Sequence, residues 1–265
     1  MNTLDLFSLK GKIALITGGR AMYGKGASIA LVDAGARLYL ASHSVDSAKD
    51  TALELRERGG MVDIIEFHQE DPQSIQKMVD LVVKKEGRID VFVNASRVIP
   101  RNGVGWFQEE SGLDWSVRVN SAGFLYMTML VGEQMIRQKS GSIINFGSMM
   151  GLVGVEKHNY DGHPEMAAGA YSHDYALNKS AITAWTRHAA SYYGKYGVRV
   201  NTLCPGGLAS DRTPERFIEN YSKHTQLGRL ANDSDIKGAV LFLASEASAY
   251  ITGLSIPVDG GYVSI

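Results

Sequence analysis

The sequence predicts a doubly wound parallel α/β sheet of about seven strands, with helices on both faces. Short apolar runs rich in β-formers alternate with longer helical patterns along the whole chain, which is typical of right-handed strand–helix–strand crossovers. A glycine cluster follows the first run, and no linker or internal repeat divides the chain. We therefore expect a single Rossmann-type domain over residues 1–265.

Each element follows from local residues. The clearest helix begins with Asp71 as N-cap and Pro72 at its first position, and it stops at Gly87. Strands are expected at 12–17, 37–42, 62–67, 89–94, 142–147, 198–207 and 254–261. Helices are expected at 24–36, 46–59, 71–87, 113–138, 171–197 and 234–246.

Composition limits the class of protein. The chain is 45% hydrophobic and 21% charged, with a net charge of −1, so it lacks the basic excess of a nucleic-acid-binding protein. No apolar run approaches the ~20 residues that span a bilayer, and no signal-peptide pattern is present. A single cysteine, Cys204, excludes an intrachain disulfide and fits a reducing compartment. We expect a cytoplasmic protein with neither nucleic-acid nor membrane partners.

The glycine cluster after the first strand predicts a dinucleotide site. Glycines let a backbone turn tightly and approach a pyrophosphate, and the following helix N-terminus supplies free N–H groups. A plain strand–helix turn is the alternative interpretation. The residues expected to bind the dinucleotide are Thr17, Gly18, Gly19, Arg20, Tyr23, Gly24 and Gly26.

The end of the second strand indicates which dinucleotide binds. Ser42 and His43 stand there, and no carboxylate is present to accept bonds from the adenosine ribose and to repel a 2′-phosphate. Arg20 in the glycine loop has the charge to pair with that phosphate. This favours NADP(H) over NAD(H). If Arg20 is only a surface residue, NAD(H) stays open.

Tyr175 and Lys179 form the most informative pair. Their i, i+4 spacing in a helical pattern places both side chains on one face, one turn apart. A phenol is a poor acid or base at neutral pH, because its ordinary pKa is about 10. A neighbouring ammonium lowers that pKa. The pair therefore predicts a tuned acid/base, with a solvated helix pair as the alternative.

Taken together, these residues resemble the short-chain dehydrogenase/reductase family over about residues 8–263. The resemblance rests on the glycine loop, Val93-Asn94-Ala95-Ser96, Asn120, Ser148, Tyr175 with Lys179, Asn201 to Gly206, Ile251-Thr252-Gly253 and Asp259-Gly260-Gly261. This ordered set is specific to the family, although no single member is.

The resemblance implies a role for each catalytic residue. Tyr175 exchanges a proton with the substrate oxygen. Lys179 lowers the pKa of Tyr175 and binds the nicotinamide ribose. Ser148 hydrogen-bonds the substrate oxygen, and Asn120 keeps a water in a proton relay. The further implied cofactor contacts are His68, Asn94, Ala95, Ser96, Pro205 and Gly206.

The sequence also departs from the family pattern. The glycine loop reads TGxxxxxGxG, two residues longer than usual, as in enoyl-thioester reductases of the same superfamily. Those enzymes place their tyrosine seven positions before the lysine, which is Ser172 here, so enoyl reduction is disfavoured. Ser96 replaces the usual glycine, and His68 stands where an adenine-contacting Asp is usual. The details of adenosine binding therefore carry over less well than the chemistry.

A long segment leads into Tyr175 and predicts the kind of substrate. Ser148 and Tyr175 are 27 positions apart, and the insertion at about 153–170 is rich in hydrogen-bonding groups. Such a wall favours a small polar substrate such as a sugar, polyol or sugar acid, although a solvated insertion remains the alternative. The expected substrate contacts are Met150, His158, Tyr160, His163 and Tyr171. The histidines and acids match no metal-ligand spacing, so no metal is expected.

The polar segment at about 207–226 is expected to be a lid over the substrate, as the resemblance implies. Arg212, Arg216 and Lys223 within it are candidates to meet an anionic group. A solvated helix face is the alternative interpretation of these charges.

The sequence thus predicts an NAD(P)-dependent oxidoreductase that interconverts a secondary alcohol and a ketone on a small polar substrate. The alternatives are a 3-oxoacyl-thioester reductase and, in another class, a catalytically silent NAD(P)-sensing regulatory protein. The resemblance further implies a homotetramer, or a homodimer, formed through the long helices. Apolar positions such as Leu125, Met129 and Trp185 suit that interface and suit a core equally.

Overall fold

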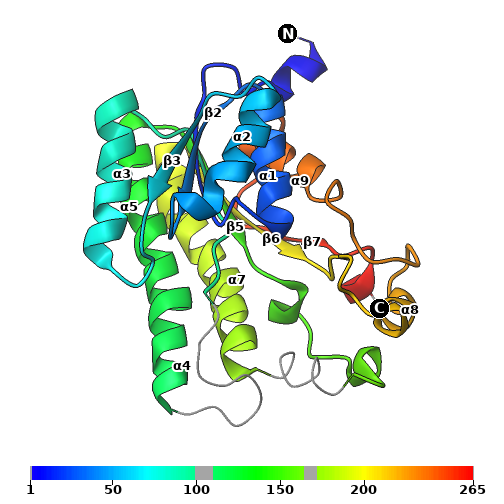
Figure 1. The fold of residues 1–265 in the computed structure, drawn as a ribbon. Helices are drawn as coiled ribbons and strands as arrows, with labels where there is room; N and C mark the ends of the chain where they lie inside the picture. The colour runs from blue at the N-terminus through cyan, green and yellow to red at the C-terminus, as the bar shows by residue number, and fades with distance from the viewer. Residues whose placement is uncertain (1, 99–109, 164–171, 265) are drawn as a thin grey trace.

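The computed structural model describes residues 2–98, 110–163 and 172–264. Seven parallel strands form one sheet in the order β3-β2-β1-β4-β5-β6-β7 (Figure 1). The strands are β1 (Ile13–Thr17), β2 (Arg37–Ser42), β3 (Val62–Glu66), β4 (Val91–Asn94), β5 (Gly141–Phe146), β6 (Val198–Pro205) and β7 (Ser255–Val258). The expected doubly wound sheet is confirmed.

Helices cover both faces of the sheet. In Figure 1, α1, α2 and α9 lie on one side, and α3, α5 and α7 lie on the other. The helices are α1 (Met22–Asp33), α2 (Lys49–Glu57), α3 (Pro72–Glu86), α4 (Glu110–Val117), α5 (Phe124–Gln138), α7 (His173–Tyr193), α8 (Glu215–Ser222) and α9 (Lys237–Ala244). None of the helices in the described ranges is long and apolar enough to cross a membrane.

Two boundaries differ from the expected ones in ways that affect the site. The helix expected at 113–138 begins at Glu110 and is interrupted by a π-helical turn, Arg118–Gly123, between α4 and α5. The helix expected at 171–197 runs from His173 to Tyr193 and continues as a 3-10 turn to Tyr196. Residue 171 lies outside the described residues. The polar and small residues of the π-helical turn were included in a single expected helix, so the interruption was not predicted.

The core consists of two apolar layers that share the sheet. All five residues of β1 are buried, and successive side chains point to opposite faces. Ile16 packs in the layer beneath α1 and α9, whereas Leu15 packs in the layer beneath α3, α5 and α7. A strand buried on both faces needs a continuous apolar run, which explains why the predicted strands could be recognised.

The strand order reverses at β1, which pairs with both β2 and β4. Thr17 and Asn94 end their strands in register at this point. In an open α/β sheet, ligands bind beyond the carboxyl ends of the strands where the order reverses. The glycine loop after β1 and the segment after β4 therefore lie side by side at the expected binding edge.

The C-terminal cap of α3 allows a test of the assigned backbone conformation. Gly87 adopts a left-handed conformation with φ 75°, and a Cβ there would have no heavy atom within 4 Å. Gly87→Ala should therefore lower the free energy of unfolding by about 1 kcal/mol through backbone strain alone.

Gly194 provides the matched control for this measurement. A Cβ added there would likewise meet open space, but its φ is −55° and its ψ is −41°, which are helical values. Gly194→Ala should raise the free energy of unfolding by up to about 1 kcal/mol. Urea denaturation of both variants gives the comparison, and equal shifts of the same sign would contradict the assigned conformations.

Candidate active site

The glycine loop closes tightly on the end of β4. Gly18 has φ 71°, and a Cβ on it would lie 2.6 Å from the Ala95 backbone carbonyl. A Cβ on Gly24 would lie 2.1 Å from the Gly18 carbonyl oxygen. Any side chain at these positions would force the loop open. The N-terminus of α1 follows this cradle, so its free N–H groups and the close backbone approach fit a dinucleotide pyrophosphate.

Buried side chains hold the ends of β1 and β4 together. The Thr17 hydroxyl donates to Asn94 Oδ1 at 3.0 Å, and Asn94 Nδ2 donates to the Phe124 carbonyl at 3.2 Å. Thr17 and Asn94 are fully buried. These two side chains are therefore engaged within the protein and hold the floor of the expected cofactor site. Two residues beyond Asn94, Ser96 Oγ donates to Gln69 Oε1 at 2.5 Å.

Tyr23 joins the glycine loop to the loop after β6. Its hydroxyl donates to the Gly206 carbonyl at 3.1 Å. Burial raises the pKa of Tyr23 well above its ordinary value, so the tyrosine is a neutral hydrogen-bond donor and not an acid/base. The cofactor residues predicted on the two loops, including Pro205, are thus brought to one edge of the sheet.

The adenosine end of the predicted cofactor site is more open. Ser42 is buried and its hydroxyl pairs with that of Ser47 at 3.1 Å, whereas His43 and the Arg20 side chain are exposed. The Arg20 carbonyl accepts a bond from the Thr51 hydroxyl at 2.9 Å, which fixes the backbone beneath the guanidinium. His68 is exposed just beyond β3, with its Nε2 3.6 Å from a Glu66 carboxylate oxygen.

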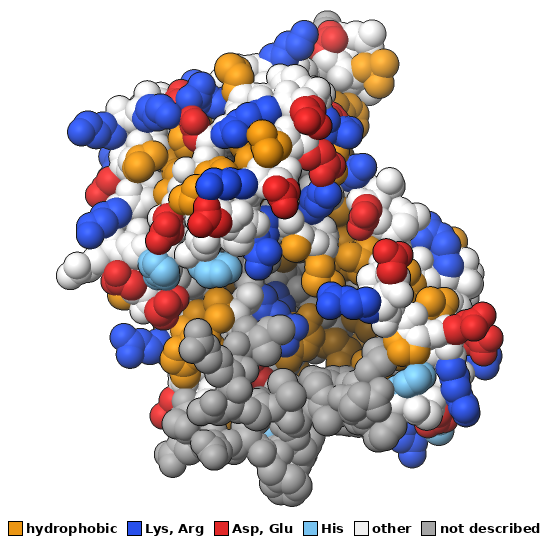
Figure 2. Space-filling view, viewed as in Figure 1, with side chains coloured by type: hydrophobic (Ala, Val, Ile, Leu, Met, Phe, Trp, Pro, Cys, Tyr) orange, Lys and Arg blue, Asp and Glu red, His pale blue; other side chains and the backbone are white. Residues whose placement is uncertain are grey.

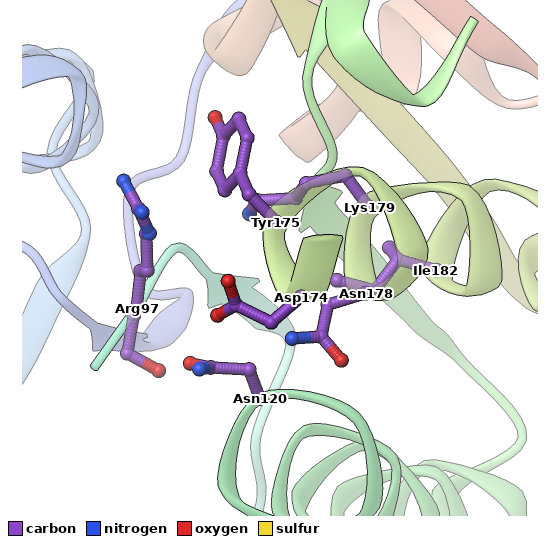
Figure 3. Close-up of a pocket in the computed structure, with 8 residues that line it drawn as sticks. Arg97, Asn120, Asp174, Tyr175, Asn178, Lys179 and Ile182 are labelled. Atoms are coloured by element: carbon purple, nitrogen blue, oxygen red, sulfur yellow. The ribbon is translucent and has the colours of Figure 1, made fainter. Parts of the chain in front are cut away.

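A small cavity brings together three of the four predicted catalytic residues (Figure 3). It is lined by Ser96, Arg97, Asn120, Asp174, Tyr175, Asn178, Lys179 and Ile182. Its volume of about 10 Å³ is close to what one water needs. The lining is polar, with donors and acceptors on several sides, so the cavity fits the single relay water that the resemblance implies.

Lys179 is buried beneath Tyr175. Its Nζ donates to the Phe146 carbonyl at the end of β5, at 2.7 Å. Burial, with a smaller contribution from the nearby charge of Arg97, lowers the pKa of Lys179 to about 7, and Cys204 opposes the change. At neutral pH the lysine is therefore poised between its charged and neutral forms, which is the range in which a proton relay is useful.

Tyr175 lies between two cations. The Arg97 guanidinium carbon is 4.2 Å from the Tyr175 ring centroid, and Lys179 Nζ is 6.0 Å from it. The tyrosine is only partly buried, and its hydroxyl points away from the helix that carries it (Figure 3). The phenol of Tyr175 therefore lies close to two basic side chains.

Asn120 is held rigidly on the π-helical turn. Its Oδ1 accepts from the Val98 N–H at 2.9 Å, and its Nδ2 donates to the Val98 carbonyl at 2.8 Å and to Ser116 Oγ at 3.2 Å. The Ser116 hydroxyl in turn donates to Asp174 at 2.5 Å. This network ties the segment after β4 to α4 and to the start of α7, and so fixes the walls of the cavity.

Ser148 follows β5 and lies outside that cavity. Its hydroxyl accepts from the Met150 N–H at 3.1 Å and caps the short 3-10 turn Met149–Gly151. This turn packs closely on α7, since a Cβ on Gly151 would lie 2.9 Å from the Lys179 carbonyl. Ser148 is therefore positioned by its packing against α7, the helix that carries Tyr175.

The insertion and the predicted lid pack against each other. Tyr160 lies 5.2 Å from Phe217 on α8, ring centroid to centroid. Tyr221 of α8 accepts from the Gly207 N–H at 2.6 Å and stacks on Tyr262 at 4.9 Å. Tyr262 also accepts a bond from the Asn159 side chain of the insertion, at 2.8 Å. The described part of the insertion, residues 153–163, thus packs together with α8 and the C-terminal turn.

The predicted substrate residues are placed unequally. Met150 and Tyr160 pack on the aromatic cluster around α8, and His163 is partly buried, whereas His158 is exposed with its Nδ1 3.5 Å from Asp161. Tyr171 lies outside the described residues. Within those residues, no three histidine, cysteine or acidic side chains are grouped so as to hold a metal ion.

The cavity residue Ile182 was not predicted from the sequence, and neither were four polar residues of the site: Ser116, Arg97, Asp174 and Asn178. Two of them carried a signal in the sequence. Arg97 directly follows the segment expected after the fourth strand, and Asp174 directly precedes the reactive tyrosine. Ser116 and Asn178 gave none, because each is one of many polar residues in a long helical pattern.

The chain is similar to known proteins over almost its whole length. A family model described as Enoyl-(Acyl carrier protein) reductase matches residues 23–263. The chain is 31% identical over 258 residues to a 3-oxoacyl-(acyl-carrier-protein) reductase of Thermotoga maritima, covering 96% of this chain and 99% of the relative. It is 30% identical over 267 residues to a 2-dehydro-3-deoxy-D-gluconate 5-dehydrogenase of Bacillus subtilis, covering 98% of each.

Among solved structures, a gluconate 5-dehydrogenase of Burkholderia cenocepacia in complex with NADP and tartrate superimposes with a TM-score of 0.87. The two chains are 27% identical, and the match covers 100% of both. The relatives are named for alcohol or carbonyl chemistry, and the match extends over the glycine loop, the sheet and the Tyr175 helix. The chain therefore belongs to the short-chain dehydrogenase/reductase family and is an oxidoreductase.

Proposed function

We propose that the protein interconverts a secondary alcohol and a ketone on a small polar substrate with NADP(H). The observation that carries this proposal is the shared cavity of Tyr175, Lys179 and Asn120 beside the glycine cradle. An acid/base, a buried lysine and space for one water meet where the strand order places a bound dinucleotide.

The protein's own residues would handle the proton and the position of the substrate. A nicotinamide cofactor, when bound, supplies the hydride donor or acceptor. Tyr175 would donate a proton to the substrate oxygen during reduction and accept it during oxidation. Lys179 would return that proton through the water in the cavity, where Asn120 fixes the surrounding backbone. Ser148 would orient the substrate oxygen, once that oxygen lies at Tyr175.

The proposed cofactor preference rests on charge at the adenosine end. Arg20 is exposed at the glycine loop, and β2 ends in Ser42 and His43 with no carboxylate. A guanidinium there favours a 2′-phosphate, whereas a carboxylate would favour the ribose hydroxyls of NAD(H).

The proposed substrate class rests on the polar insertion and on two sugar-acid relatives. The acyl-carrier-protein relative keeps 3-oxoacyl-thioester reduction as the second candidate. An aromatic cluster, formed by Tyr160, Phe217, Tyr221 and Tyr262, adds apolar surface near the site. Most of this surface is buried where the insertion packs against α8. A space-filling view shows a hollow with hydrophobic side chains in its floor and basic side chains around it (Figure 2).

Tyr175→Phe should lower kcat by about 10²- to 10⁴-fold, because it removes the proton-transfer group. Binding of NADPH should remain close to wild type, as measured by nucleotide fluorescence. Tyr192→Phe, an exposed tyrosine on the same helix, is the control and should keep full activity. Wild-type-like turnover by Tyr175→Phe would refute the mechanism. A wild type inactive on every alcohol and ketone of a polyol and keto-sugar panel would favour the NAD(P)-sensing alternative.

Arg20→Ala should weaken NADPH binding about tenfold or more and leave NADH binding nearly unchanged, because it removes a charged hydrogen bond to the 2′-phosphate. Titration of each nucleotide into the protein measures this directly. Lys25→Ala is the control, since Lys25 already pairs with Glu54 at 2.7 Å. Equal losses for both nucleotides in Arg20→Ala would contradict the phosphate role.

The lowered pKa of Lys179 predicts a pH dependence of stability. Between about pH 7 and pH 10.5 the unfolded lysine binds a proton that the folded lysine has largely lost. Stability should therefore rise with pH across this window and level off below it. Lys179→Met should remove this pH dependence from the urea midpoint. Lys195→Met, at an exposed position, should retain it. If the urea midpoints of wild type and Lys179→Met changed with pH in parallel, the lowered pKa of Lys179 would be disproved.

A further inference from the structure

Arg97 carries a charge that the fold does not use. Its side chain is exposed, yet its guanidinium carbon lies 4.2 Å from the Tyr175 ring centroid, and it lines the cavity with Lys179 (Figure 3). By contrast, Arg37 pairs with Asp63 at 2.8 Å and Arg58 pairs with Asp33 at 2.7 Å. Within the described ranges, no carboxylate forms an ion pair with Arg97.

Asp174 is the acidic residue that shares this cavity, and its carboxylate is committed to the fold. It accepts bonds from the hydroxyls of Ser116 and Ser172. It also lies in the first turn of α7, where the helix dipole stabilises a negative charge. Asp174 is thus held by its own helix and by α4, and the planar fork of Arg97 stays directed toward the reactive tyrosine.

We propose that Arg97 binds a carboxylate of the substrate, so that the substrate is a small hydroxy or oxo acid. A guanidinium binds a carboxylate with two parallel hydrogen bonds, which fixes both position and orientation. Since the fork lies against the Tyr175 ring, the carboxylate would lie only a few bonds from the reacting carbon. The inference rests on the proposed function, because it takes the substrate oxygen to lie at Tyr175.

The cofactor is a poorer occupant for Arg97. Its pyrophosphate belongs at the glycine cradle and the start of α1, and its 2′-phosphate belongs near Arg20. Arg97 instead follows β4 and faces the phenol that serves the substrate. The lid residue Arg212 is the rival anion site, but it is an exposed residue before α8, and no contact connects it with Tyr175 in the described part of the chain.

A carboxylate on Arg97 would also favour the catalytic form of the lysine. The charge of Arg97 contributes to the lowered pKa of Lys179. Burial is the larger cause of that lowered pKa, but an anion that neutralises Arg97 would remove this repulsion, and so raise the pKa of Lys179 and favour its charged form. Binding of the substrate would thereby prepare the cation beneath Tyr175.

The test is calorimetric binding of L-tartrate and D-gluconate to the full-length protein saturated with NADP⁺. Arg97→Gln should weaken the better-bound acid about tenfold or more, because a charged hydrogen bond is lost. Arg97→Lys should fall between Arg97→Gln and wild type, since it keeps the charge but not the fork. NADPH affinity should stay within about twofold in both variants. Arg187→Gln removes the same charge from an exposed position on α7 and should bind like wild type.

Three results would overturn the proposal: no binding of either acid by wild type, unchanged binding by Arg97→Gln, or an equal loss in NADPH affinity. Loss of acid binding in Arg212→Gln alone would assign the anion to the lid. Because binding needs no turnover, these outcomes are separate from failure of the proposed oxidoreduction. Where D-gluconate is oxidised, Arg97→Gln should reduce kcat/KM for it and spare the neutral analogue D-sorbitol.

Discussion

The pairing of β1 with both β2 and β4 is the constraint on which the site depends. It places β2 and β3 on one side of β1 and β4 to β7 on the other, so the loops after β1 and β4 separate at the same edge of the sheet. The bond between Thr17 and Asn94 closes the sheet directly beneath that parting. The glycine cradle, the cavity and the Tyr175 helix all lie at this edge. The pairing of the strands therefore fixes their relative positions, independently of the catalytic side chains.

Burial explains why the fold was predictable from the sequence. A strand covered on both faces must be apolar throughout, as in β1, and a helix over it needs definite ends, such as Asp71 and Gly87 around α3. The positions of Tyr175 and Lys179 were predictable for a related reason, since one helical turn fixes their common face. The π-helical turn at Arg118–Gly123 was not predicted, because the residues on both sides of it are helical and the turn has no capping residue of its own.

The parts of the site that sequence could not supply are those made by contacts between distant segments. Asp174 and Ser116 are 58 positions apart, and Ser121 and Asn178 are 57 apart, yet hydrogen bonds join each pair. Such bonds follow from how α4 and α5 lie against α7, which no window of residues encodes. A buried polar network of this kind must be nearly complete, because an unpaired polar group inside a protein is costly. The cavity walls are therefore rigid, and a water bound there would have little choice of position.

Because the side of the site formed by the Asn120 network is rigid, any adjustment to a substrate must come from the opposite side. The insertion and α8 meet through Tyr160 and Phe217, and both are fastened to the C-terminal turn through Tyr262. These contacts are few and mainly aromatic, whereas the Asn120 network is hydrogen-bonded throughout. Hydrogen bonds from Asn159 and Gly207 to tyrosine hydroxyls add to this aromatic packing. Any adjustment to a substrate would therefore fall to α8 and residues 153–163, while Lys179 and Asn120 are held against the sheet by buried hydrogen bonds.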